Sequence, residues 1–171
     1  IATLPNYYGR DNLLAGGDFS FKPSSAQTVN ATFLSSRTTD RGTPDAQGNA
    51  AQVKYGYETR KITFGGQLEH YDRDFQMDTA FYNRSGFTSG WGYGEINFYP
   101  KNTNQSALKR VNLFTWNKYG RDQIQDGNER FSLIGIRVNF TRQGFLRVDQ
   151  AWGREPWRGE RFNNSRIRTQ G

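Results

Sequence analysis

Residues 132–140 read Ser-Leu-Ile-Gly-Ile-Arg-Val-Asn-Phe, and the spacing of their apolar side chains decides the fold. An apolar residue stands at every second position from Ile134 to Phe140, and Arg137 and Asn139 lie between them. Successive side chains of a β-strand point to opposite faces of the sheet. This spacing therefore predicts a strand with one apolar and one polar face.

The same period of two recurs in both directions from this stretch, at 13–21, 28–33, 51–58, 62–69 and 145–152. Residues 90–99 are ambiguous, because their bulky side chains change parity near Gly94. Either a β-bulge lies there or the strand carries Trp91 and Tyr93 on its inner face. Weaker strands are expected at 111–119 and 162–169. The chain is thus predicted to be all-β, with about eight or nine strands and no helix.

The connections between these strands are predicted to alternate in length. Short turns are expected near Pro23, Arg60, Pro100 and Arg142, and longer polar connections near Arg41, Asp74, Asp126 and Arg158. The longer ones are expected to cover about 37–49, 71–85 and 121–130. Such alternation predicts an antiparallel up-and-down meander, the layout of an outer-membrane-type β-barrel or of part of a larger one.

The composition excludes several kinds of protein. The 171 residues include no Cys and one His, so a disulfide framework, a thiolate nucleophile and a multi-histidine metal centre are excluded. Only 34% of the residues are apolar but 15% are aromatic, and the net charge is +7. This is a poor composition for a large aliphatic core in water.

Alternation alone also suits a soluble sandwich, whose polar face meets water. A membrane barrel is favoured because several strands reach the roughly 9–11 residues that cross a bilayer at a tilt. Aromatic residues also gather near strand ends, as they do at membrane interfaces. These aromatic residues are Phe19, Phe21, Tyr55, Tyr57, Phe98, Tyr99, Phe140, Phe145 and Trp152. Charged residues in the strand middles would face a wet lumen, namely Lys54, Glu58, Glu69, Glu95, Arg137, Arg147 and Asp149.

Two stretches resemble a known family. Residues 72–84 read Asp-Arg-Asp-Phe-Gln-Met-Asp-Thr-Ala-Phe-Tyr-Asn-Arg, and residues 140–148 read Phe-Thr-Arg-Gln-Gly-Phe-Leu-Arg-Val. Both are similar to the C-terminal β-barrel region of uncharacterised bacterial envelope proteins that carry an N-terminal family-nine-like carbohydrate-binding module. The resemblance implies a non-enzymatic barrel in the outer membrane of a Gram-negative cell. It supplies no catalytic residues.

The candidate ligand-binding residues are Trp91, Tyr93 and Glu95, whose rings and carboxylate could hold a saccharide-like solute in a lumen. We expect no catalytic residue, no cofactor and no metal site. A calcium site at Asp72, Asp74 and Asp78 is conceivable, but their spacing lacks the order of the known calcium loop. A solvated loop explains this cluster more simply.

The excess of basic residues indicates which partners the chain could bind. The cations are dispersed and no recognition helix is expected, so nucleic acid is an unfavoured partner. Outer-membrane lipid and lipopolysaccharide phosphates are the expected partners, together with other envelope proteins or the rest of the same chain. The arginines that suggest this are Arg37, Arg41, Arg73, Arg84, Arg121, Arg154 and Arg158.

These observations lead to one main interpretation of the chain. We expect residues 1–171 to form a single barrel segment, a fragment of a longer chain, that anchors an envelope protein and passes or holds a solute. A soluble all-β carbohydrate-binding or surface module is the alternative, as is a β-structured subunit of a larger envelope assembly.

Overall fold

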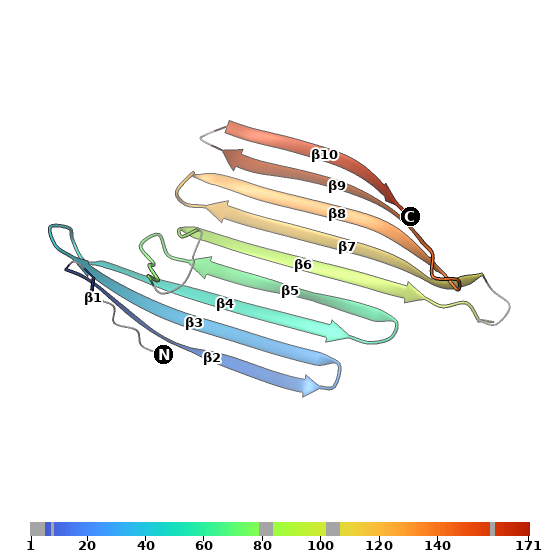
Figure 1. The fold of residues 1–171 in the computed structure, drawn as a ribbon, viewed down its shortest axis with the longest axis horizontal. Coiled ribbons are helices and arrows are strands. Elements are labelled where there is room, and N and C mark those ends of the chain that lie inside the picture. The colour runs from blue at the N-terminus through green and yellow to red at the C-terminus, as the bar shows by residue number, and fades with distance from the viewer. Residues whose placement is uncertain (1–5, 8, 79–83, 102–106, 158–159) are drawn as a thin grey trace.

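The computed structural model is one antiparallel sheet in which each strand pairs with its neighbours in sequence (Figure 1). It describes residues 6–7, 9–78, 84–101, 107–157 and 160–171. The strands are β1 (Asn6–Tyr7), β2 (Arg10–Ser24), β3 (Gln27–Asp40), β4 (Ala46–Glu58), β5 (Ile62–Tyr71), β6 (Phe87–Phe98), β7 (Leu108–Asp122), β8 (Gly127–Phe140), β9 (Phe145–Trp157) and β10 (Glu160–Gln170). The predicted all-β meander is confirmed, with β2–β10 as its nine long strands. Within the described residues, no helix has the length and apolarity that a membrane span requires.

The sheet is open in the described residues. Its pairing order runs from β1 to β10, and β1 covers only the first two residues of β2. In Figure 1, β2 and β10 lie at opposite sides of the sheet. The structure therefore shows the meander, whereas closure into a barrel stays a prediction.

The connections reach alternate ends of the sheet, as an up-and-down meander requires, but the predicted contrast in length is only partly present. The connections 41–45 and 123–126 are shorter than expected, whereas 99–107, expected to be a short turn, is longer than either. One end, here called the 72–86 rim, has the connections 41–45, 72–86 and 123–126. The other end, the 59–61 rim, has 25–26, 59–61, 99–107 and 141–144. The expected loops at 37–49 and 121–130 are wrong in extent, since β3, β4, β7 and β8 extend into them. Polar residues there satisfy their backbone groups in the ladder, so polarity did not mark the strand ends.

Register assigns every strand residue to one of two faces. Residues paired directly across an antiparallel ladder share a face, so Phe19, Ala31, Val53 and Leu68 lie together on what we call the apolar face. The opposite face, called the polar face, carries Asp18 and its partners in the adjacent row: Thr32, Gln52, Glu69, Ser89 and Glu129. Each apolar row predicted from the period of two lies on the apolar face.

Burial differs sharply between the two faces. The buried strand residues of the described chain all belong to the polar face. Besides Gly48, Gly120 and Gly153 they are Asn12, Leu14, Ser36, Thr38, Ala50, Phe87, Ser89, Asn97, Asn112, Asp122, Leu133, Asp149 and Ala151. Large side chains of the apolar face are exposed instead, and Leu68 and Ile167 reach 69% and 72% exposure. The molecule thus packs its polar side chains together and presents its apolar ones outward.

Candidate functional site

The three predicted site residues lie together on the polar face of β6. The β5–β6 and β6–β7 registers run without a shift through Gly94, so there is no bulge there. Trp91, Tyr93 and Glu95 therefore share one face, whereas Ile96 lies on the other. The Trp91 and Tyr93 rings stack with centroids 6.1 Å apart. Of the two interpretations that the sequence left open, the strand with an aromatic inner face is the one observed.

Tyr93 and Glu95 line a cavity of about 390 Å³, which Trp91 does not line. Phe114 and Trp116 supply further rings, and Arg110, Arg137 and Arg147 supply positive charge. Aromatic faces with hydrogen-bonding groups between them suit a polar solute with an apolar side. Register accounts for this combination, because it brings polar-face residues of β6, β7, β8 and β9 side by side.

Glu95 also takes part in a network of hydrogen-bonded side chains with three asparagines. The Asn112 Nδ2 donates to Glu95 Oε1 at 2.8 Å and contacts Asn97 Oδ1, and Asn139 Nδ2 donates to Asn112 Oδ1 at 2.7 Å. Since Asn112 and Asn97 are buried, these bonds satisfy groups that would otherwise be costly to bury. Asn97, Asn112 and Asn139 were not predicted from the sequence as site residues. Their parity, opposite to Val138 and Ile96, places them on the polar face.

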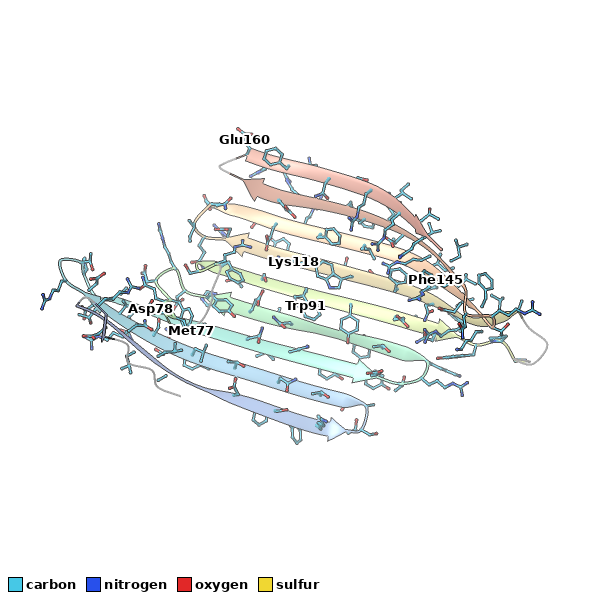
Figure 2. All side chains as sticks on the ribbon, in the orientation of Figure 1. Met77, Asp78, Trp91, Lys118, Phe145 and Glu160 are labelled. Carbon is cyan, nitrogen blue, oxygen red and sulfur yellow. The ribbon has the colours of Figure 1, made fainter. Side chains whose placement is uncertain are left out.

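An ion-pair cluster lies near the 72–86 rim of the polar face. Glu129 accepts from Lys118 at 2.9 Å and from Arg84 at 3.2 Å, and Arg84 also pairs with Asp122 at 2.9 Å. Trp91 and Lys118 are direct partners across β6 and β7, as Figure 2 shows. Arg84, one of the arginines expected to meet lipid phosphates, forms ion pairs with both of these carboxylates.

Asp149 is a second charged centre, nearer the 59–61 rim. Its Oδ1 accepts from Arg147 at 2.6 Å and from Arg168 at 3.0 Å, and its side chain is fully buried. The Asp149 Oδ2 and the Arg137 Nε are buried without a hydrogen-bond partner among the described groups. Both atoms belong to the polar face, and Arg137 lines the cavity beside Glu95, whereas Asp149 does not.

The described residues 72–78, which follow β5, fold over the polar face of β2–β4. Phe75 is only 2% exposed and packs with Leu14 and Ala50. Gln76 and Asp78 bond to β2 and β3 through Asn12, Ser36 and Arg10. Met77 and Asp78 lie beside the β2–β4 ends in Figure 2. The segment thus covers one end of the polar face.

The acidic cluster in this segment has ordinary partners. The Asn49 backbone amide donates to Asp72 at 2.7 Å, and with the His70 ring it lowers the pKa of Asp72 below its usual 3.8. Asp78 pairs with Arg10 at 2.8 Å. No group of three metal-ligating residues is found in the described chain.

The apolar face has a distinct charge pattern. From β3 to β10 its described positions include no Asp or Glu, and its arginines lie toward the 72–86 rim at Arg37, Arg121, Arg130, Arg154 and Arg161. Arg130 and Arg161 were not among the arginines selected from the sequence. The parity that Arg130 shares with Ile134 would have identified it. Arg41 and Arg73 are exposed in connections, and Arg158 lies outside the described residues.

Comparisons with protein-family models, with curated proteins and with solved structures returned no match. The class of this protein is therefore defined by its fold alone, which is an all-β antiparallel meander.

Proposed function

We propose that this chain is a segment of a bacterial outer-membrane β-barrel whose apolar face meets lipid and whose polar face lines the lumen. Its role is non-enzymatic: it anchors an envelope protein and admits or holds a saccharide-like solute beside Tyr93 and Glu95. The resemblance of residues 72–84 and 140–148 to envelope barrels agrees with this proposal.

The observation that carries the proposal is the continuous apolar face. Its large exposed side chains include Phe19, Phe33, Val53, Phe64, Leu68, Ile96, Leu113, Ile134, Ile136, Leu146, Val148 and Trp152. Monomeric soluble proteins rarely expose apolar patches beyond a few hundred Å². A face that continues over seven strands, β3–β9, without a carboxylate needs a partner that is itself apolar. Lipid is such a partner, and the polar face can then stay wet.

The large apolar side chains of the apolar face form a band, here called the apolar belt. The position of this belt shifts along the strand direction from one strand to the next, as the strand tilt of a barrel requires. Successive cross-strand partners of Ala31 on β3 form one row across the sheet, which ends at Arg130 on β8. The residues between them in this row are Val53, Leu68, Gly90 and Tyr119. The apolar stretch is centred on Ala31 in β3 but near Ile136 in β8, six residues from Arg130 toward the 59–61 rim. Six residues of roughly 3.3 Å against five strand spacings of about 4.8 Å give a tilt of about 40°. Outer-membrane strands tilt by roughly 35–45°.

A pair of neighbouring positions tests the proposal. Val53→Arg places a cation in the middle of the belt, and we expect it to lower folding stability in lipid vesicles by about 2–4 kcal/mol. Gln52→Arg, one residue away on the polar face beside Lys54, should cost much less. Denaturant titration of vesicle-folded protein measures both. Equal effects, or a monodisperse wild-type protein in buffer without detergent, would contradict the membrane assignment and favour a soluble module.

A further inference from the structure

Three arginines gather on the apolar face at the 72–86 rim. Arg130 and Arg154 are direct partners across β8 and β9, and Arg161 lies on the same face of β10. With Tyr119 and Asn128 they line a small hollow of about 210 Å³. The lining of this hollow thus consists of cationic and hydrogen-bonding groups.

The positive charge of this hollow has no acidic partner among the described residues. No ion pair of Arg130, Arg154 or Arg161 with a carboxylate is found there, whereas the neighbouring Arg121 pairs with Asp126 at 3.3 Å. The adjacent acids, Glu129, Glu155 and Glu160, have the opposite parity and so belong to the polar face. Like charges placed directly across a ladder destabilise it. A bound anion would remove this penalty at Arg130 and Arg154.

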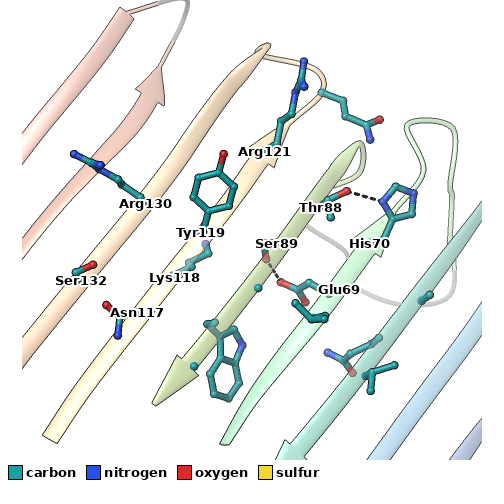
Figure 3. Close-up of a pocket in the computed structure, with 18 residues that line it drawn as sticks. Glu69, His70, Thr88, Ser89, Asn117, Lys118, Tyr119, Arg121, Arg130 and Ser132 are labelled. Carbon is teal, nitrogen blue, oxygen red and sulfur yellow. Dashed lines mark hydrogen bonds between the residues drawn. The ribbon is translucent and has the colours of Figure 1, made fainter. Parts of the chain in front are cut away.

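A larger hollow of about 970 Å³ adjoins the arginine hollow and shares Tyr119 and Arg130 with it. Gly92 of β6 leaves its middle open, because a Cβ there would meet nothing nearer than a backbone oxygen at 3.6 Å. The Leu68 side chain lies over Gly90, and Val53 lines the far side. Figure 3 shows Tyr119 and Arg121 on β7 and Arg130 on β8. A cationic hollow thus continues into a mainly apolar one. This arrangement matches a lipid that has a charged headgroup and an apolar chain.

The distance of the arginines from the centre of the apolar belt matches the level of a lipid headgroup. Arg130 lies six residues from Ile136, the approximate centre of the belt on β8. That is roughly 20 Å along the strand, or about 15 Å along the membrane normal at the tilt derived above. The hydrocarbon core of a bilayer is about 30 Å thick, so half of it is about 15 Å. Arg130 therefore reaches the level at which lipid phosphates begin.

We propose that Arg130, Arg154 and Arg161 form a binding site for the phosphate of a phosphorylated membrane lipid, with one acyl chain lying over Gly92 and against Leu68. Guanidinium groups bind phosphate oxygens in a bidentate manner, and that geometry suits paired arginines. This site rests on the proposed function, since it needs the apolar face to meet lipid. It makes the expected lipopolysaccharide contact specific to one place on the sheet.

The experiment uses the protein in detergent micelles and diphosphoryl lipid A as the probe, with binding measured by native mass spectrometry. We expect R130Q/R154Q/R161Q to weaken binding about tenfold or more, since each surface cation contributes measurably to phosphate attraction. The matched control R41Q/R73Q/R142Q removes the same charge from exposed connections and should change binding less than about twofold. Dephosphorylated lipid should bind the wild-type protein as weakly as the triple variant binds lipid A.

Equal losses in the two triple variants would overturn the site, because only net charge would then matter. Equal binding of the phosphorylated and dephosphorylated lipids would overturn it as well. Insertion into vesicles is measured for each variant in parallel. If every variant inserts but lipid A shows no preference for these arginines, this site fails and the membrane assignment stands. If the wild-type protein does not insert, the proposed function itself fails.

Discussion

At Gly48, the lack of a side chain allows Asp74 and Phe75 to lie directly on β4. A Cβ built at Gly48 would come within 2.3 Å of the Phe75 backbone nitrogen and 2.5 Å of its Cα. Because these are backbone atoms, no side-chain rotation can relieve the clash. Ser36 Oγ bonds both to the Gly48 carbonyl and to the Gln76 amide, which holds the close approach in place.

We therefore expect Gly48→Ala to destabilise the fold by about 1–3 kcal/mol, as overpacking commonly does. Gly56→Ala in the same strand is the matched control, since a Cβ there meets nothing within 4 Å. Denaturant unfolding of both variants measures the difference. Similar unfolding free energies for the two variants would show that Phe75 does not lie against Gly48.

Individual residues also show how far the sequence could be interpreted. The period of two placed Ile134, Val53 and Leu68 on the correct face, because each strand obeys it locally. It left Trp91 and Tyr93 undecided, because bulky rings suit either face and only the register of β5 and β7 settles the matter. It could not find the contacts of Phe75 with Leu14 and Ala50, since these join parts of the chain that are far apart.

At the scale of elements, β10 is an edge strand that pairs only with β9 among the described strands. The Arg168–Asp149 ion pair ties the two strands together on the polar face. Arg168 is partly exposed, so we expect this tie to contribute only about 1 kcal/mol.

Arg168→Gln should therefore speed hydrogen exchange in β10 about fivefold, through more frequent opening of this edge. Arg166→Gln, two residues away on the same face, is the control because Arg166 pairs with no carboxylate among the described residues. Mass-spectrometric exchange over 162–169 reports both variants. Exchange that responds equally to both would assign the effect to charge in general.

The connections show where prediction by element fails. Polar runs at 37–49 and 121–130 look like loops, but all of their residues except 41–45 and 123–126 belong to β3, β4, β7 and β8. Asn12, Thr38 and Asp122 are buried on the polar face, where polar residues are required for its hydrogen bonds. A sheet whose packed side is polar makes hydrophobicity a poor guide to strand length, although it remains a good guide to strand facing.

At the scale of the whole molecule, the sheet reverses the arrangement of a protein that folds around an apolar core. Ion pairs and amide chains lie on the packed face, and the exposed face is apolar with arginines near one rim. If the apolar face meets lipid as proposed, 34% apolar residues are enough, because only every second strand position must be apolar. The edges at β2 and β10 would have to pair with each other or with further strands before such a sheet could cross a bilayer, because lipid cannot satisfy open edges.

The most direct test of the central claim compares two tryptophans on opposite faces. Trp152 lies on the apolar face of β9, four residues or roughly 13 Å along the strand from Val148 in the belt, whereas Trp116 lies on the polar face against Phe131. Each is kept as the single Trp, with the other three changed to Phe, in vesicles whose acyl chains are brominated toward the headgroup. We predict strong quenching of Trp152 and weak quenching of Trp116. Equal quenching of both, or quenching of neither, would contradict a lipid-facing apolar surface.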